Sequence, residues 1–384
     1  MKIAKIEQFF PQMRTRLVKI TTDDGIVGWG EATLEGKPQS TMGAVEDLSD
    51  LLIGKDPLRI EFNWQNMYRT SYYRGGNVLM SAISGIDQAL WDIAGKFHGV
   101  PVYKLLGGEV RDRIRMYAHW GIVDTSEAEQ ERAKARLDAL RPYGYTAYKS
   151  GIGGKWRGHE PPAVIEAFVQ RAYLMREWLG PDVEIAFDFH AKMTPALAVE
   201  ICNEIKGMRP MFVEEPVPQE NLDALKWVTD HVAFPIATGE RLLSRWEFRE
   251  LFEKQAVSYI QPDSSHAGGI TELKKIANMA EVYYTHVMPH CALGPLALAA
   301  CTHVDAVIPN FLMQETVAPN WLADVVENPW PVADGYMALP TEPGLGLDMN
   351  EKEVKKHHRC ATDRYTEELG GEYLFDQDGS IADW

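Results

Sequence analysis

The chain has 384 residues, of which 45% are hydrophobic and 24% charged, so it resembles an ordinary globular protein and exceeds the usual size of one compact core. Its formal charge of −16 disfavours binding to nucleic acid or to anionic membranes, because both need a basic surface. Four widely spaced cysteines without a CxxC pair argue against a disulfide framework and a thiolate zinc site, so we expect a protein of the reducing cytoplasm.

The first part of the chain predicts a small α+β domain. Residues 1–32 alternate apolar and polar positions, which excludes a signal peptide or a membrane span, and Asp24-Gly25 indicates a hairpin turn. From about residue 40 to 98 the pattern is helical, and apolar residues recur at i, i+3 and i+4 in LMSAISGIDQALWDIAGKFHG. Gly99 and Pro101 end this helix, so we assign residues 1–112 to the first domain.

From about residue 113, short apolar strands alternate with amphipathic helices, which is typical of parallel βα units. We place eight strands at RIRMYAHWG, TAYKSGI, EIAFDFH, MFVEEP, FPIATGE, SYIQPD, HVMPHC and FLMQET. The last six end in polar residues 26, 26, 23, 27 and 25 positions apart, namely Asp188, Glu214, Glu240, Asp263, His290 and Glu315. This regularity predicts a closed (β/α)8 barrel over residues 113–330, with catalytic groups at the carboxyl ends of its strands. In the loop-rich residues 331–384, GLGLDM is predicted as a strand that returns to the first domain.

Three carboxylates are expected at successive strand ends. Asp188, Glu214 and Glu240 would repel one another there unless a cation lies among them. Hard oxygen ligands without thiolates favour Mg²⁺ over zinc. The alternative for each carboxylate alone is a polar cap or a salt-bridge partner.

Two histidines are candidate acid–base groups. Asp263 and His290 end neighbouring strands, where the carboxylate would orient the imidazole of a base. His190 lies two residues after Asp188 and would share its strand face, so we expect it across the barrel mouth from His290 as an acid. Glu315 would donate to a developing oxyanion if its surroundings keep it protonated, and a surface acid is the alternative. The other histidines that we interpret as structural are His98, His119, His231, His303, His357 and His358.

These residues lie in motifs that resemble the enolase superfamily, and within it the acid-sugar dehydratases of the mandelate racemase group. The motifs are YRGG at 73–76, ALWDIAGK at 89–96, LLGG at 105–108, FDFH, VEEP, ATGERL, IQPDSSHAGGIT, PHCALGPLALAA and QET. The resemblance covers nearly the whole chain. It implies a (β/α)8-type barrel with an α+β capping domain, built from residues 1–112 and the carboxyl-terminal segment 331–384.

The resemblance also implies the chemistry. A Mg²⁺ ion would bind Asp188, Glu214 and Glu240, while His290 with Asp263 would remove the C2 proton of a sugar acid. His190 would assist loss of the 3-hydroxyl, and Glu315 would stabilise the transition state. The product would be a 2-keto-3-deoxy acid, with D-galactonate as the leading substrate.

Other substrates and reactions stay open at this point. Gluconate, mannonate, a pentonate or an aldarate is an alternative substrate, a C2 epimerase is an alternative reaction, and a noncatalytic sugar-acid-binding barrel is a third hypothesis. Gly151 replaces the second lysine of the K-x-K pair of racemases, which disfavours racemisation by that lysine. Gly294 stands where the related mannonate dehydratases carry an aspartate, which favours a galactonate-type enzyme.

Substrate contacts and partners are predicted more coarsely. Lys149, Lys192 and Arg241 are candidate contacts for the substrate, with a solvated surface as the alternative for each. Loops 151–162 and 316–335 and the segment around Glu35-Gly-Lys37 are candidates to line the pocket. We expect a small-molecule substrate, no nucleic-acid or membrane partner, and a dimer-based homo-oligomer of up to eight chains, as in the relatives.

Overall fold

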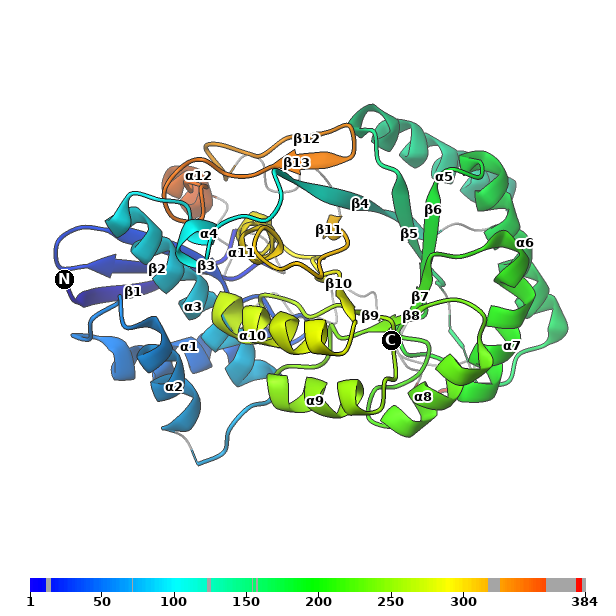
Figure 1. The fold of residues 1–384 in the computed structure, drawn as a ribbon, viewed down its shortest axis with the longest axis horizontal. Helices are drawn as coiled ribbons and strands as arrows, with labels where there is room; N and C mark the ends of the chain where they lie inside the picture. Colours follow the sequence, from blue (N-terminus) through cyan, green and yellow to red (C-terminus); the bar gives the residue numbers. More distant parts are fainter. Residues whose placement is uncertain are drawn as a thin grey trace.

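The computed structural model describes residues 1–11, 15–70, 72–122, 126–153, 155–156, 158–316, 325–356 and 378–381. An amino-terminal sheet with its helices lies on the left of Figure 1, and a barrel of strands surrounded by helices lies on the right. Within the described part of the chain, no helix has both the length and the apolar character needed to cross a bilayer.

The amino-terminal domain begins with an antiparallel sheet. Its strands are β1 (Ile3–Phe9), β2 (Leu17–Thr22) and β3 (Val27–Glu31), and they lie in this order. The predicted turn at Asp24-Gly25 joins β2 to β3, with Gly25 at a φ of +90°. The helices that follow are α1 (Pro38–Leu52), α2 (Ile60–Arg69), α3 (Asn77–His98) and α4 (Val102–Leu105). As predicted, α3 ends at Gly99, which adopts the left-handed conformation.

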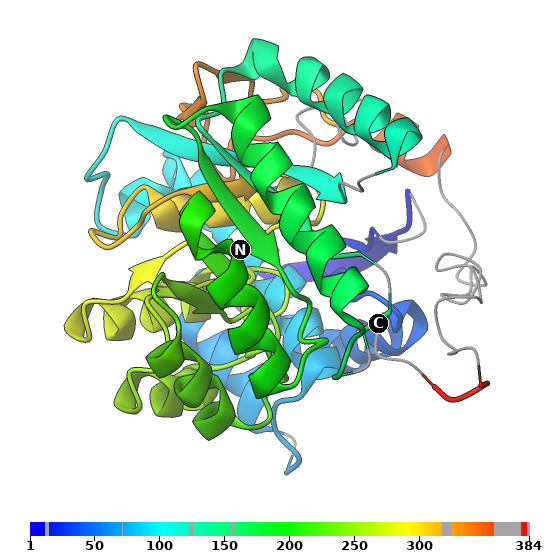
Figure 2. The same ribbon diagram turned by 90° about the vertical axis from the view of Figure 1, so that its right-hand side faces the viewer.

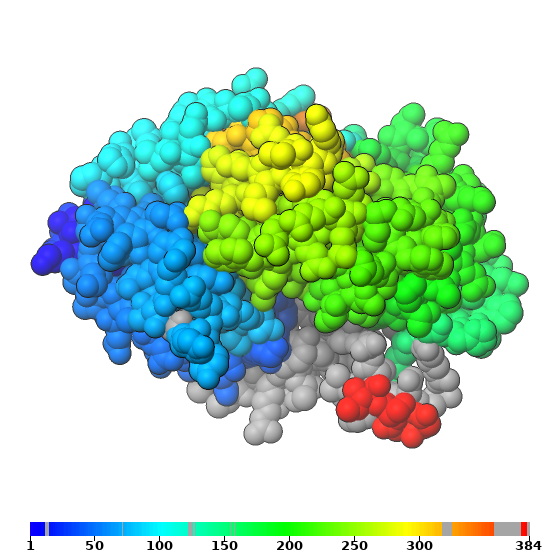
Figure 3. All heavy atoms as spheres, turned by 60° about the horizontal axis from the view of Figure 1, so that its bottom comes forward, coloured from blue at the N-terminus to red at the C-terminus, as the bar shows by residue number. Residues whose placement is uncertain are grey.

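Helix α3 is the central element between the two parts of the molecule. All of its residues from 80 to 95 except Trp91 are buried. On one side it packs on β3, where a Cβ on Gly30 would lie 2.0 Å from the carbonyl oxygen of Gly85, so the strand lies directly on the helix backbone. On the other side it packs on α10 of the barrel, which begins at Gly269. In Figure 3 the blue amino-terminal atoms accordingly lie against the yellow-green barrel atoms.

Eight parallel strands form the barrel. They are β4 (Arg113–Ile122), β5 (Ala147–Gly151), β6 (Glu184–Asp188), β7 (Phe212–Glu214), β8 (Ile236–Thr238), β9 (Tyr259–Ile260), β10 (His286–Val287) and β11 (Gln314–Thr316). Strands β4 to β10 are neighbours in chain order, and β11 pairs with β4. A bridge between Val287 and Phe311 joins β10 to the segment that enters β11, which closes the ring. The predicted (β/α)8-type fold is therefore confirmed.

Helices cover the outside of the strands, as Figure 2 shows for the green helices in front. They are α5 (Glu127–Leu140), α6 (Pro162–Leu179), α7 (Pro195–Ile205), α8 (Leu222–His231), α9 (Arg245–Glu253), α10 (Gly269–Val282) and α11 (Pro295–Asp305). Two 3-10 turns, Arg141–Tyr143 and Lys206–Met208, follow α5 and α7. The apolar side chains of these helices and of the strand faces beneath them form one continuous core.

The segment after the barrel contacts both parts of the molecule. Strands β12 (Val332–Ala333) and β13 (Tyr336–Ala338) form a hairpin that pairs antiparallel with the first residues of β4. Further on, Leu345 donates its backbone N–H to Asp92 of α3 at 2.8 Å, and Lys19 of β2 pairs with Glu351 of α12 (Glu351–Lys356). GLGLDM forms two isolated bridges in place of the predicted strand, because its glycines turn the chain with positive φ. The boundaries at 112 and 330 stay predictions.

Apolar side chains fill the inside of the barrel. One group faces inward from seven of the eight strand positions: Tyr117, Ala147, Ala186, Phe212, Ala237, Met288 and Met313. The large side chains of Tyr117, Phe212, Met288 and Met313 combine with three alanines, and all seven residues are at most 2% exposed, so the layer is packed. The interior therefore has a solid floor, and the space above it at the carboxyl ends of the strands holds polar groups.

We expect Phe212→Ala to lower the free energy of unfolding by about 3–5 kcal/mol, because it removes a large, fully buried aromatic side chain of this floor. Denaturant unfolding followed by tryptophan fluorescence measures the change. Phe62→Ala, at a side chain that is 46% exposed, serves as the control and should change the midpoint little. Equal midpoints for the two variants would contradict a packed floor.

Candidate active site

The polar groups of the barrel mouth form the next inward-facing layer above the apolar floor. Side chains two positions apart on a strand face the same way. Two residues after six of the seven floor positions, and after the adjoining Tyr259, come His119, Lys149, Asp188, Glu214, Gln261, His290 and Glu315, while Ala237 is followed at this spacing by Gly239. The period of two thus turns an apolar layer into a layer of titratable groups at the carboxyl end of the barrel.

Lys149 holds the acidic part of this layer together. Its Nζ lies 2.8 Å from Glu214, 2.7 Å from Glu315 and 3.8 Å from Asp188, and the lysine is 1% exposed. Burial lowers its pKa, but Glu214 and Glu315 raise the pKa further, so the ammonium stays charged. Gln261 adds an amide donor to Glu214 at 2.7 Å. The surface position that was an alternative for Lys149 is therefore wrong.

The pKa of Glu315 is lowered in this arrangement. Burial raises its pKa, but Lys149, His290 and His119 lower it further, to about 2. Its second oxygen accepts the backbone N–H of Cys291 at 3.0 Å. Lys149, which lies beside Glu315 inside the barrel, thus favours the ionised carboxylate, and the role of Glu315 as a hydrogen-bond donor stays a prediction.

The two candidate acid–base histidines stand on opposite sides of the ring. His190 follows β6 and His290 follows β10, which are four strand positions apart in a barrel of eight. The His190 Nε2 lies 2.9 Å from Asp188, whose charge is the main cause that raises the pKa of His190 to about 9. Strand β6 ends at Asp188, so His190 reaches this place through a turn with a φ of +48° and not by strand alternation as predicted.

His290 is held from both ring nitrogens. Its Nδ1 bonds to the buried Asp263 at 2.7 Å, and its Nε2 lies 3.0 Å from Glu240. Burial lowers the pKa of His290, but Glu240, Asp263 and Glu315 outweigh it and raise the pKa well above its ordinary value. His290 and Asp263 are therefore neighbours, as predicted. Their roles in catalysis stay predictions.

A cavity of about 800 Å³ opens above this layer and is lined from both domains. The barrel contributes His190, His290, Glu240 and Arg241, and the first domain contributes Glu35 together with Gly76 and Asn77. Lys192 and the described residues of loops 151–162 and 316–335 are not among its lining, and residues 317–324 of the second loop lie outside the described part. The segment around Glu35 thus lines the cavity, as we expected from the sequence.

Two further histidines in the cavity were not predicted as site residues. His119 at the carboxyl end of β4 lines the cavity, and burial lowers its pKa to about 4, so it is neutral near pH 7. The same strand-end rule that selected His290 would have found it. His266 pairs with Glu35 at 3.5 Å and with the Ser81 hydroxyl at 3.1 Å. That contact joins the two domains, so the local sequence around His266 gives no signal for it.

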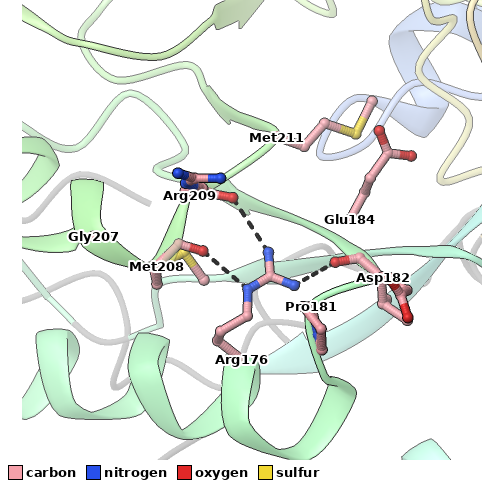
Figure 4. A pocket seen from close by; sticks show the side chains of 9 residues that line it. Arg176, Pro181, Asp182, Glu184, Gly207, Met208, Arg209 and Met211 are labelled. Carbon is pink, nitrogen blue, oxygen red and sulfur yellow. Dashed lines mark hydrogen bonds between the residues drawn. The ribbon is translucent and has the colours of Figure 1, made fainter.

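A second hollow, of about 370 Å³, lies at the opposite end of the barrel, where β6 and β7 begin. Figure 4 shows Arg176 pointing at the carbonyl oxygens of Met208 and Arg209, to which it donates at 2.9 and 3.2 Å. The guanidinium thus ties loop backbones together. No histidine is among the described residues that line this hollow, and the amino end of such a barrel contributes to stability.

The arrangement of the acids bears on a metal centre. Asp188, Glu214 and Glu240 belong to three adjacent strands, with Asp188 and Glu214 buried and Glu240 lining the cavity. Lys149 contacts the first two and His290 the third. In the described residues, no group of three or more His, Cys, Asp or Glu side chains is gathered as for a metal ion. The predicted ligand set stays a prediction.

Comparisons with known proteins identify the family. Residues 130–353 match the enolase C-terminal domain-like family, and residues 10–107 match the mandelate racemase / muconate lactonizing enzyme N-terminal domain. The chain therefore belongs to the enolase superfamily, as its motifs indicated. Two similar relatives are D-galactonate dehydratases: that of Ralstonia pickettii (strain 12J) is 41% identical, with all of both chains covered. That of Klebsiella pneumoniae (strain 342) is 42% identical over 94% of this chain and 96% of the relative.

Solved structures agree with the fold. A putative dehydratase from Mesorhizobium loti superposes with a TM-score of 0.88 at 36% identity, covering 94% of this chain and 99% of the other. A putative galactarate dehydratase from Agrobacterium radiobacter, with bound sodium and L-malate, gives 0.89 at 33% identity over the whole of both chains.

We expect Lys149→Met to destabilise the protein by about 3–5 kcal/mol, because it leaves the buried Asp188, Glu214 and Glu315 without their cation. The shift of the unfolding midpoint in metal-free buffer measures this. Lys226→Met removes an i,i+4 pair with Asp230 on the surface and should cost under about 1 kcal/mol. A Lys149 variant as stable as the Lys226 variant would show that the ammonium is not needed.

Proposed function

We propose that the protein is a hydro-lyase that dehydrates a sugar acid, with D-galactonate as substrate, to a 2-keto-3-deoxy acid. The observation that carries this is a likeness to D-galactonate dehydratases of about 40% identity across the full chain. The cavity supports it, because two imidazoles and a set of carboxylates meet at the carboxyl end of the barrel. We also propose a cytoplasmic location and a dimer-based homo-oligomer.

The donor set fits a Mg²⁺ ion. Asp188, Glu214 and Glu240 offer hard carboxylate oxygens from adjacent strands, and such ligands suit Mg²⁺ better than softer metals. Lys149 balances only part of their charge, so a divalent cation would neutralise the rest. When bound, the cation would stabilise the negative charge that develops on the substrate carboxylate.

The side chains of this chain would carry the proton steps. In its neutral form His290, with Nδ1 bonded to Asp263, would take the C2 proton at Nε2. His190, on the other side of the mouth, would donate its Nε2 proton to the departing 3-hydroxyl. The C3–O bond breaks, water leaves, and the enol that forms tautomerises to the 2-keto acid. This dehydration needs neither an oxidant nor a second substrate.

Turnover of D-galactonate with Mg²⁺ tests this proposal, with 2-keto acid formation as the readout. The panel should include gluconate, mannonate, a pentonate and galactarate. Loss of activity on chelation and its return with Mg²⁺ are expected. Absence of keto acid from every member of the panel would refute a dehydratase, and deuterium incorporation at C2 without keto acid would indicate an epimerase.

We expect His290→Asn to abolish both deuterium exchange at C2 and dehydration, because Asn cannot accept the proton. Proton NMR in deuterium oxide follows exchange, and the keto-acid assay follows dehydration. His231→Asn is the matched control, since His231 is an exposed histidine that bonds only to the carbonyl of Trp227 among the described contacts. Full activity of the His290 variant would remove the assignment of His290 as the base.

Asp188→Asn should act differently and mainly weaken the metal. Replacing one carboxylate of the set lowers its charge, so more Mg²⁺ is needed for half-maximal activity. A titration of activity against Mg²⁺ measures the change. An unaltered Mg²⁺ requirement would exclude Asp188 as a ligand.

The cavity wall favours a monoacid over a diacid. Glu35 stays ionised, because its bond to His266 outweighs burial and lowers its pKa to about 2. Among the described lining residues the cationic His190, His266 and Arg241 are each paired with a carboxylate, at 2.9 Å to Asp188, 3.5 Å to Glu35 and 3.1 Å to Glu215. A second carboxylate on the substrate would meet Glu35 without a free counter-charge.

We therefore expect kcat/KM for galactonate to exceed that for galactarate by at least about tenfold, since two like charges ~4 Å apart cost about 1 kcal/mol in water and more in a cavity. Glu35→Gln should narrow this ratio by removing the repelling charge. Steady-state kinetics on both substrates measures it. Equal use of both acids by the unaltered enzyme would show that Glu35 does not select.

A further inference from the structure

Helix α11, which follows the His290 loop, lacks a capping side chain of its own. The residue before its first turn is Gly294, and Pro295 at its first position has no N–H to donate. The backbone N–H groups of Gly294 and Ala297 still need acceptors, because both residues are buried. His290 precedes this helix start by four residues, so the helix start sets one end of the loop that carries the imidazole.

Glu31 of the first domain supplies the missing acceptors. It is fully buried at the end of β3, and its two carboxylate oxygens accept from Gly294 at 2.9 Å and from Ala297 at 3.2 Å. A Cβ on Gly294 would lie 2.6 Å from Glu31, so the glycine permits this approach. A carboxylate at a helix amino terminus also interacts favourably with the helix dipole. One domain thus caps a helix of the other.

A second chain of hydrogen bonds joins the same strand to the partner of His290. Gln88 of α3 accepts from the Glu31 N–H at 2.8 Å and donates to the carbonyl of Ser264 at 3.0 Å. Ser264 in turn donates to the carbonyl of Ala297 at 3.0 Å, which closes a ring back to α11. The neighbouring Ser265 donates its N–H to Asp263 at 2.6 Å.

We propose that Glu31 is a positioning residue for His290. It fixes the start of α11 and, through Gln88, the loop of Asp263, so the first domain holds both members of the His290–Asp263 pair at their separation of 2.7 Å. The other end of the His290 loop is held by Glu315 at Cys291. This inference rests on the proposed function, in which His290 removes the substrate proton. Glu31 itself touches no reacting atom.

The kinetic test is Glu31→Ala. It should lower kcat on the order of 100-fold with little change in KM, because a shift of about 1 Å in a proton-abstracting group costs rate more than binding. Asp92→Asn is the matched control: Asp92 is also a fully buried acid of the first domain, and accepts backbone N–H groups from Trp29 and Leu345, which lie outside the barrel loops. It should lose stability but keep kcat within about twofold. Equal losses of kcat in both variants would reduce Glu31 to a structural role.

A rescue variant separates capping from general damage. Gly294 has an extended backbone, with φ −79° and ψ −178°, so a serine fits there once Glu31 is removed. Serine is a preferred capping residue and would accept from Ala297 within the barrel itself. The pair Glu31→Ala with Gly294→Ser should regain much of the lost kcat, whereas Gly294→Ser alone should lose activity by clashing with Glu31. A double variant no better than Glu31→Ala would overturn the proposal.

Hydrogen exchange gives a readout that does not need turnover. Backbone amides of residues 291–298 should exchange faster in Glu31→Ala than in the unaltered protein or in Asp92→Asn, and slow again in the double variant. If Glu31→Ala does not fold, Glu31→Gln, which keeps one acceptor oxygen, takes its place. Unchanged exchange in a folded Glu31 variant would contradict the inference. If amide exchange is faster in the Glu31 variant but the unaltered protein turns over no sugar acid, the capping role of Glu31 stands and the proposed function is refuted.

Discussion

The polar layer of this barrel depends on one buried cation. Asp188, Glu214 and Glu315 converge from different strands onto an apolar floor, where their mutual repulsion is not screened by water. The ammonium of Lys149 lies within 4 Å of all three and stays charged because of them. Acids and lysine therefore require one another: neither set could be buried alone at acceptable cost. The strand ends can hold several carboxylates for chemistry because the cation is built into the neighbouring strand β5.

Much of the fold followed from two periodicities. Helical spacing located α3, and alternating short strands and helices located the eight strands of the barrel. The strand-end rule placed Asp188, Glu214, Glu240, Asp263, His290 and Glu315 around one mouth, because strands that run parallel must all end on the same side. The strands themselves are shorter than their apolar runs. Residues such as Glu240 and Asp263 lie in the turns just after the ladder, where the backbone is free to re-aim a side chain.

The sequence alone could not predict contacts between residues that are far apart in the chain. The ionised state of Glu315 depends on Lys149, which is 166 residues away in the chain, and no local pattern couples the two. The Glu35–His266 pair joins the two domains in the same way. His119 is a different case, because its position at the end of the first barrel strand was readable, but an isolated histidine carries no partner signal. His190 reached its predicted neighbourhood through a left-handed turn that strand alternation does not describe.

The two domains contribute different parts of the cavity. His190 and His290 lie in the turns just after barrel strands β6 and β10, so the barrel strands place both histidines at the cavity. Part of the cavity wall comes from the first domain at Glu35, which lies in a loop, and loops tolerate change better than the elements that they connect. Yet four residues earlier Glu31 caps α11 from the end of β3. The first domain is therefore not freely exchangeable, because the loop that carries Glu35 follows directly on the strand whose Glu31 caps a barrel helix. Thr33, between the two glutamates, donates its hydroxyl to Glu31, so sequence changes in this loop are better tolerated beyond Thr33.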